Sequence, residues 1–432
     1  MKSTNDFGRY ITYSVLITFL FVSACERPNN NINGNGSTEE NDSTLTSAEK
    51  ASFFVDNSGG MFGYVTRDES HVGGNNFVLA VSNLAQNTNF RRDNVEVDYN
   101  LINGPVDIKI TPIENSAQDF INCLNPNCFN QGDISGNDLN AMFQIALDNA
   151  GHENISVFIS DAIYDIQDKT DPITSLISEG FETRNRFIDR LEGENIQALI
   201  VKLNSHFSGA YYFAVTTGGV VIRQTRPYYI FIFGKSELLN SYFDDNYIES
   251  LAGHIDHARF FLPSDYQIVY EPSTAYNKKG DFKKDRNDPK RLTNATRENG
   301  EFEFSVGVDF SSLPLSNDYL TDVNHYEVSD NFEVLSVEKY RPDMFAAITS
   351  FEPSHMITLR ATGLPQGIIN IKLLNELPAW VEESHTDDDR NIEGDSITTW
   401  GFKYLIQGIV DAYSEVAEQD YFTTKTVTLS RN

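Results

Sequence analysis

Short, almost wholly apolar segments constrain the fold of this chain most. Ile155-Ser-Val-Phe-Ile-Ser160 and Tyr228-Tyr-Ile-Phe-Ile-Phe233 carry apolar residues on both sides of an extended chain. Such strands need a sheet that is covered on both faces, and segments with helical periodicity, such as residues 138–150, lie between them. Residues 51–250 are therefore predicted to form an α/β domain with a doubly wound, mostly parallel sheet.

The pattern changes in the C-terminal part of the chain. Phe302–Phe310, residues 369–373 and residues 424–429 alternate apolar and polar side chains, as antiparallel strands with one face in water do. Residues 400–417 instead carry an apolar stripe at helical spacing. We predict a β-rich C-terminal domain, a β-sandwich with one helix, over residues 258–432.

The N-terminus has the features of a secretory signal. Its apolar run, residues 15–22, is shorter than the ~20 residues that a membrane-spanning helix needs. Val22-Ser-Ala-Cys25 follows and resembles the bacterial lipobox, in which the cysteine is lipidated and becomes the new N-terminus. The resemblance implies a signal peptide over residues 1–24 and a lipid anchor on Cys25. An ordinary secretory signal with an incidental cysteine is the alternative.

A membrane-tethered position in the cell envelope follows from this interpretation. Residues 25–50 contain little that folding can bury and are predicted to be a disordered tether. Glu26 does not resemble the aspartate that retains lipoproteins at the inner membrane of enteric bacteria, so the outer membrane or the cell surface is favoured. The formal net charge of -29 repels nucleic acid, and we expect no nucleic-acid partner.

The two remaining cysteines, Cys123 and Cys128, lie close together on either side of a Leu-Asn-Pro-Asn segment. In an oxidising compartment this spacing favours a local disulfide. Metal binding by two cysteines alone is the weaker alternative.

Two of the predicted strands end in an aspartate, Asp56 after Ser52-Phe-Phe-Val55 and Asp161 after Ser160. Ligands of open α/β sheets bind beyond the carboxyl ends of the strands. Two carboxylates at that edge can hold a divalent cation, and Mg²⁺ needs few protein ligands. The structural alternative is that each aspartate only caps the loop or helix that follows it.

The residues around both aspartates resemble the von Willebrand factor A (VWA) family and its metal-ion-dependent adhesion site. That site consists of a strand followed by Asp-x-Ser-x-Ser and, later, a strand that ends in Ser-Asp, and Asp56-Asn-Ser-Gly-Gly60 and Ser160-Asp161 are similar. The predicted elements also follow a similar order, with a strand, a helix, a pair of strands and helices before strands and helices alternate. The resemblance implies a VWA-like fold over residues 51–250.

Carried over residue by residue, the resemblance implies that Asp56, Ser58 and Asp161 are metal ligands. Gly60 stands where the family has its second serine, and Asn137 stands before a predicted helix where the family has threonine. One hydroxyl ligand is therefore missing, while Asn137 still offers a carbonyl oxygen. The implied site is degenerate, and its binding of Mg²⁺ is expected to be weak or to depend on a partner.

These features predict a membrane-anchored envelope lipoprotein whose VWA-like module binds a protein partner without catalysis. In the family, an acidic group of the partner completes the coordination of the metal, and we expect an adhesion or assembly function. One alternative is a metal-assisted envelope hydrolase that uses Asp56 and Asp161, for which His71 and His206 are the nearest candidate bases. The other is a metal-free structural scaffold of an envelope complex.

Two further patterns are weaker. His254-Ile-Asp-His257 would place two imidazoles on one face of a helix, but it lacks the glutamate of zinc-protease motifs, so a surface or core position is expected. Thr386-Asp-Asp-Asp-Arg390 is acidic enough for a Ca²⁺ ion, but a solvated loop is the commoner outcome for such a segment.

Overall fold

The computed structural model describes the chain from residue 47 to residue 430, with short gaps. The described ranges are 47–67, 75–113, 116–166, 169–216, 218–341, 343–344, 348, 350–363, 365–392 and 397–430. The predicted signal peptide, the lipidated Cys25 and His71 lie outside these ranges. The predicted tether ends earlier than residue 50, because Ala48 is buried and the first strand begins at Lys50. No helix in the described ranges is long and apolar enough to cross a membrane.

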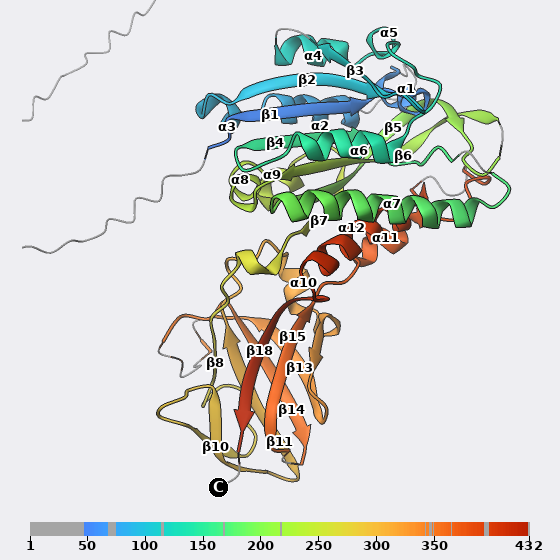
Figure 1. The fold of residues 1–432 in the computed structure, drawn as a ribbon. Coiled ribbons are helices and arrows are strands. Elements are labelled where there is room, and N and C mark those ends of the chain that lie inside the picture. Colours follow the sequence, from blue (N-terminus) through green and yellow to red (C-terminus); the bar gives the residue numbers. More distant parts are fainter. Residues whose placement is uncertain are drawn as a thin grey trace, which may run out of the picture. The chain divides into compact units, whose positions relative to one another are not determined.

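A seven-stranded mixed sheet organises the first part of the described chain (Figure 1). Its spatial order is β3-β2-β1-β4-β6-β5-β7. The strands are β1 (Lys50–Asp56), β2 (Glu96–Asn103), β3 (Lys109–Ile113), β4 (Asn154–Ser160), β5 (Gln197–Tyr212), β6 (Gly219–Gly234) and β7 (His254–Phe260).

The predicted α/β class is confirmed, and the parallel order holds at the centre of the sheet. β2, β1 and β4 are parallel neighbours, and β5 runs in the same direction, whereas β3, β6 and β7 run the opposite way. The difference from a mainly parallel sheet arises at the two edge strands, β3 and β7, and at β5 and β6, which form one long hairpin. Antiparallel strands need only a short connection, so the chain returns directly and inserts β6 between β4 and β5.

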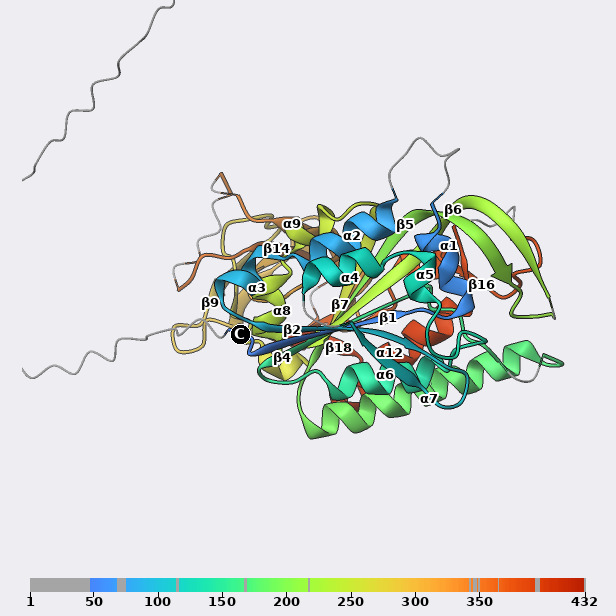
Figure 2. The same ribbon diagram turned by 90° about the horizontal axis from the view of Figure 1, so that it is seen from above.

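Helices cover both faces of this sheet, as Figure 2 shows. Side chains alternate along β6, so that Tyr228, Ile230 and Ile232 belong to one core cluster while Tyr229, Phe231 and Phe233 belong to the other. The helices that contribute to the first cluster include α2 (Asn76–Ala85), α4 (Ala117–Cys123), α8 (Ser236–Tyr242) and α9 (Asp245–Glu249). The helices that contribute to the second cluster include α6 (Leu139–Asp148), α7 (Pro172–Gly193) and α12 (Phe402–Val416).

The later part of the chain forms two mostly antiparallel sheets with one shared core cluster, in agreement with the predicted β-rich character. One sheet has the order β12-β15-β18-β10-β9 and the other β13-β14-β11-β8. Their strands are β8 (Tyr270–Pro272), β9 (Asp281–Lys284), β10 (Arg291–Thr296), β11 (Glu301–Val308), β12 (Tyr326–Val328), β13 (Phe332–Lys339), β14 (His355–Thr362), β15 (Gly367–Leu374) and β18 (Tyr421–Leu429).

The predicted C-terminal helix is present as α12, but its apolar stripe packs on the α/β core and not among the β-sandwich strands. The segment between β15 and β18 therefore returns to the seven-stranded sheet, together with α11 (Ala379–Glu383) and the fully buried Trp400. α12 lies against α7, and two glycines allow this approach. A Cβ atom added to Gly408 would lie 2.4 Å from the carbonyl oxygen of Gly180.

We predict that Gly408→Ala destabilises the protein by about 1–3 kcal/mol, because the added carbon meets the backbone of α7, which cannot rotate away. Gly193→Ala, at the end of the same α7, is the matched control, since its added carbon meets nothing within 4 Å and alanine favours a helix. Urea unfolding followed by circular dichroism measures both variants. An unchanged midpoint for Gly408→Ala would contradict the close packing of the two helices.

Candidate functional site

Asp56 and Asp161 come together because the strands that carry them are parallel neighbours. β1 pairs with β4 in a register that places Val55 opposite Ile159, so both strands end at the same edge of the sheet. Both aspartates are buried. The two acidic residues that the sequence singled out thus lie beside each other, although they are far apart in the chain.

Asp56 is held by hydrogen bonds from three sides. Its Oδ1 accepts from the Ser58 amide at 2.8 Å, and its Oδ2 accepts from Ser160 Oγ at 2.8 Å and, more weakly, from Asn137 Nδ2 at 3.5 Å. Burial raises the pKa of Asp56, and these hydrogen bonds oppose the increase because they stabilise the ionised form. Ser160 belongs to the Ser-Asp motif at the end of β4, but the motif alone does not predict its hydrogen bond to Asp56.

Asp161 has a pKa near neutrality. Burial, and next the neighbouring charge of Asp56, raise the pKa of Asp161 to about 7, while the positive charge of Arg226 opposes this increase. The Ile163 amide donates to Asp161 Oδ1 at 3.2 Å. The residue between them, Ala162, has a φ of 58°, a left-handed conformation that costs an alanine about 1 kcal/mol. Backbone strain is therefore concentrated directly beside this carboxylate.

The other predicted ligands also reach this edge. Ser58 follows β1, and Asn137 is fixed by a bridge to Gly104 and by Asp138, which caps the N-terminus of α6. Asn137 Oδ1 is buried and has no hydrogen-bond partner. A Cβ atom at Gly60 would lie 3.2 Å from Asp161 Oδ2, so a serine hydroxyl at this position would stand inside the site.

The assembled oxygen atoms form a donor set suited to a hard cation. Two carboxylates, a buried amide oxygen and a serine hydroxyl are the kinds of ligand that Mg²⁺ prefers. No group of three or more His, Cys, Asp or Glu side chains with metal-binding geometry occurs in the described ranges. An ion at this edge would therefore depend on neutral oxygens and water for the rest of its coordination.

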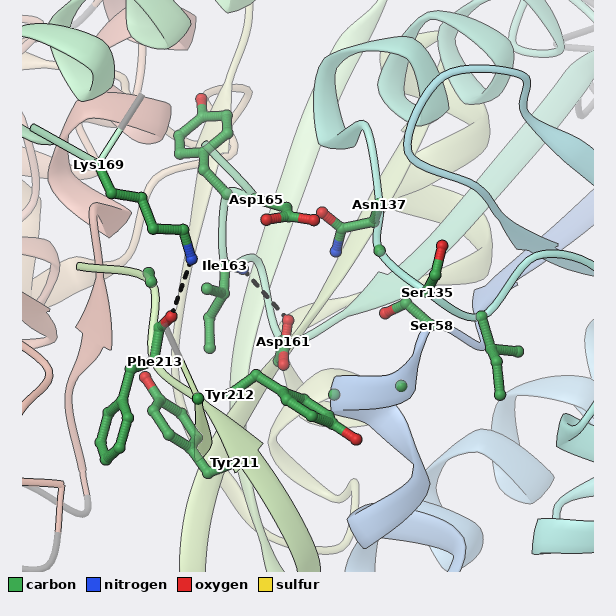
Figure 3. A pocket seen from close by; sticks show the side chains of 17 residues that line it. Ser58, Ser135, Asn137, Asp161, Ile163, Asp165, Lys169, Tyr211, Tyr212 and Phe213 are labelled. Carbon is green, nitrogen blue, oxygen red and sulfur yellow. Dashed lines mark hydrogen bonds between the residues drawn. The ribbon is translucent and has the colours of Figure 1, made fainter. Parts of the chain in front are cut away.

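A pocket of about 580 Å³ opens onto this edge (Figure 3). Ser58, Asn137 and Asp161 line it, whereas Asp56 lies behind them. Its other walls come from distant parts of the chain, namely residues 59–60, 134–136, 163–165, 169, 211–214 and 218. The side chains of Asp165 and Asn137 point toward each other in Figure 3, and burial raises the pKa of Asp165.

The β5–β6 hairpin forms one wall, and contacts from other segments hold its tip. Lys169 Nζ donates to the carbonyl oxygens of Phe213 and Thr216 at 3.2 and 3.3 Å. Asp389 accepts from the Ala214 amide at 2.6 Å and from the Tyr211 hydroxyl at 3.2 Å. Nothing in the local sequence pattern indicated these contacts.

The acidic segment 386–390 therefore differs from the expected solvated loop. Asp388 is exposed, but the side chain of Asp389 is only 1% exposed because it binds the hairpin tip. Its oxygens accept from the Ala214 and Val215 amides and from the Tyr211 hydroxyl, which offsets the cost of burying this carboxylate.

The opposite wall is anchored near the disulfide. Cys123 and Cys128 are joined in the structure, between α4 and α5 (Pro126–Phe129). Asn57 Nδ2 donates to the Phe129 and Gln131 carbonyl oxygens at 2.8 and 2.9 Å, and the Gly59 amide donates to Ile134 O at 3.0 Å. The disulfide-containing segment is thus tied directly to the loop that follows Asp56.

Histidine does not line the described part of this pocket. His206, one of the two candidate bases, lies on β5 but is not among the lining residues, and His71 is outside the described ranges. No protein-family model and no curated protein matches this chain.

The raised pKa of Asp161 predicts how stability depends on pH. The folded protein binds this proton more tightly than the unfolded chain, in which the ordinary value of 3.8 applies. Without metal, the stabilising contribution is present below about pH 4 and is lost as the pH rises to about 7. Asp161→Asn cannot ionise, so it should be more stable than the wild type at pH 8, on the order of a few kcal/mol, with a smaller gain at pH 5.

Urea unfolding at both pH values, in the presence of a chelator, measures this difference. Equal pH dependence in the variant and the wild type would show that Asp161 is ionised in the folded protein throughout this range.

Proposed function

We propose that this chain is a lipid-anchored envelope protein that captures a protein partner through Mg²⁺ at the pocket beyond β1 and β4. One observation carries the proposal: two buried carboxylates and a buried amide oxygen without a partner converge at the edge of a pocket. Buried carboxylates are retained when they are paired or coordinate a metal. Asp56, Ser58, Asn137 and Asp161 are the residues that would hold the ion.

The charge balance of the site supports a cation. Arg226 is only 2% exposed, its Cζ lies 5.0 Å from the centre of the Tyr211 ring, and its charge lowers the pKa of Asp161. One guanidinium cannot neutralise both Asp56 and Asp161 when both are ionised. The site therefore takes up either a proton, which the raised pKa of Asp161 reflects, or a metal ion that replaces the proton.

The VWA-like interpretation is supported by the position of these residues within the fold. The hairpin β2–β3 and α6 precede β4, and the strand order β3-β2-β1-β4 places the two acidic strand ends at the centre of the sheet. This agrees with the order of elements that the resemblance implies. The antiparallel insertion of β6 departs from simple strand–helix alternation, so the family assignment stays part of the proposal.

Each residue has a distinct role in this proposal. Asp161 and Asn137 line the pocket and face the partner, while Asp56 orients the Ser58 loop and Asn137 through its hydrogen bonds. A bound Mg²⁺ would supply positive charge and open coordination positions for a carboxylate of the partner. Tyr212, which is 57% exposed at the rim, offers a surface for the residues that flank this carboxylate.

The membrane anchor remains the lipid on Cys25, with the outer membrane or the cell surface as the favoured location. A chain held in this way needs no spanning helix of its own. Its binding site would then face partners within reach of the tether. The hydrolase alternative uses Asp56 and Asp161 for its metal. With no histidine among the described pocket residues, Asp165, whose pKa burial raises, is a candidate base there.

Gly60→Ser is expected to tighten Mg²⁺ binding roughly tenfold, which corresponds to about 1.4 kcal/mol from one added ligand. The hydroxyl would stand near Asp161 Oδ2, where the family resemblance places it. Gly60→Ala is the matched control, because it brings the same crowding without the oxygen. Calorimetric titration of Mg²⁺ and Mn²⁺ into the full chain in detergent compares the three proteins. If Gly60→Ser and Gly60→Ala behave alike, the hydroxyl does not reach a metal.

Asp56→Asn is expected to abolish Mg²⁺-dependent capture of a partner while the fold is retained. The amide oxygen can take the place of Oδ1 and accept from the Ser58 amide, and the amide nitrogen can take the place of Oδ2 and donate to the Ser160 hydroxyl oxygen, but the negative charge is lost. Envelope extracts are applied to immobilised protein with Mg²⁺, and bound proteins are eluted with a chelator. Capture that is equal for both proteins and insensitive to the chelator would support the metal-free scaffold instead.

A further inference from the structure

We propose that His254 and His257 form a second metal site, which takes a divalent transition-metal ion of the zinc, copper or nickel class. His254 Nε2 and His257 Nδ1 lie 3.3 Å apart. Two imidazole nitrogens bound to one tetrahedral Zn²⁺ at about 2.0–2.1 Å are separated by about 3.3–3.4 Å. The two rings are thus already spaced as two ligands of one ion.

The two histidines share one face only because β7 is irregular. Side chains on a strand alternate between faces, so residues three positions apart should point in opposite directions. The pairing of β7 with β5 shifts in register between Lys202 and Leu203, which face Asp256 and His254, and Ile255 is the extra residue. This bulge turns His254 to the side of His257, and bulges commonly re-aim side chains in this way. The spacing of the two histidines suggests a helix, whereas the structure has a bulged edge strand there.

A carboxylate also orients one of the two rings. Asp245, in the first turn of α9, lies 3.3 Å from His257 Nε2, on the opposite side of the ring from Nδ1. A proton held on Nε2 by this carboxylate leaves the Nδ1 lone pair free toward His254. Carboxylate–histidine pairs of this kind orient metal-binding imidazoles in many proteins. Arg259 also contacts Asp245, at 3.0 Å, and keeps the carboxylate in place.

Without metal, the same geometry is a hydrogen bond from His254 Nε2–H to His257 Nδ1. Metal binding requires His254 to carry its proton on Nδ1 instead, which is a change of tautomer and releases no proton. A small rotation of the His254 ring then directs both lone pairs to one point. His257, unlike His254, also lines a cavity of about 290 Å³, so water can reach this ring.

The ligand type distinguishes this site from the pocket beyond β1 and β4. Imidazole nitrogens select zinc, copper and nickel, whereas carboxylate and carbonyl oxygens select magnesium. Within the described ranges, no third His, Cys, Asp or Glu joins the pair as a ligand. The site therefore has two protein ligands and open positions, which suits an exchangeable ion better than a permanently bound structural one.

The test is calorimetric titration of Zn²⁺ into the full chain in detergent, with Mg²⁺ in excess to occupy oxygen sites. The wild type should bind one ion at this pair, and His254→Ala and His257→Ala should each weaken that binding by at least about tenfold. Asp245→Asn, which keeps both imidazoles, should weaken it by about tenfold. His152→Ala is the matched control, because His152 is 64% exposed and also pairs with a carboxylate.

A spectroscopic measurement identifies the ligands directly, so that other zinc-binding groups of the protein do not affect the conclusion. With one equivalent of Cu²⁺, electron paramagnetic resonance should show nitrogen splitting from two imidazoles in the wild type and in His152→Ala, and from fewer in His254→Ala. Equal zinc affinity and equal splitting in the wild type and His254→Ala would overturn the proposal, as would the absence of zinc binding. Asp56→Asn should leave the zinc affinity and the nitrogen splitting unchanged. A loss of function at the proposed partner-binding site can therefore be distinguished from a loss of the histidine site.

Discussion

Two aspartates, buried side by side at the ends of parallel strands, impose the constraint on which the rest of this structure depends. Removing a carboxylate from water is costly, and a second one beside it adds repulsion. The fold offsets this with the Ser58 amide, Ser160 Oγ, Asn137 Nδ2 and the charge of Arg226. Even with these groups in place, Asp161 keeps a pKa of about 7, so the site retains affinity for a further positive charge.

These groups come from segments that meet only in the folded protein. Ser58 follows β1, Asn137 precedes α6, and Arg226 belongs to the hairpin strand β6. The tip of the β5–β6 hairpin is held by Asp389. In the sequence, this residue follows most of the strands of the β-sandwich. The return of α12 to the α/β core brings this segment back. A pocket made in this way depends on packing across the whole α/β part, including the glycine contact between α7 and α12.

The two proposed sites would give the seven-stranded sheet two different kinds of metal chemistry. Oxygen atoms gather where β1 and β4 end, and imidazole nitrogens gather at the bulge of edge strand β7. The register links the two places, because Ser160 lies opposite Tyr229, Tyr229 opposite Lys202, and Lys202 opposite Asp256. They therefore lie at the same level of the sheet but three strands apart. Hard and borderline cations could occupy them independently.

The sequence by itself determined the α/β class, the approximate positions of the central strands and of α6 and α12, and the two acidic strand ends. These features are local, because apolar periodicity and a residue's place at the end of a strand are properties of a short segment. The proximity of Asp56 and Asp161 could be predicted because the carboxyl ends of parallel strands lie at the same edge of a sheet.

Only the tertiary structure decided the antiparallel course of β6, the packing of α12 on the α/β core, and the approach of Asp165, Arg226 and Asp389 to the site. It also decided that His254 and His257 share one face, since a single extra residue in β7 reverses the direction of a side chain. Each of these outcomes depends on pairing or packing between segments far apart in the chain, and no local pattern contains that information.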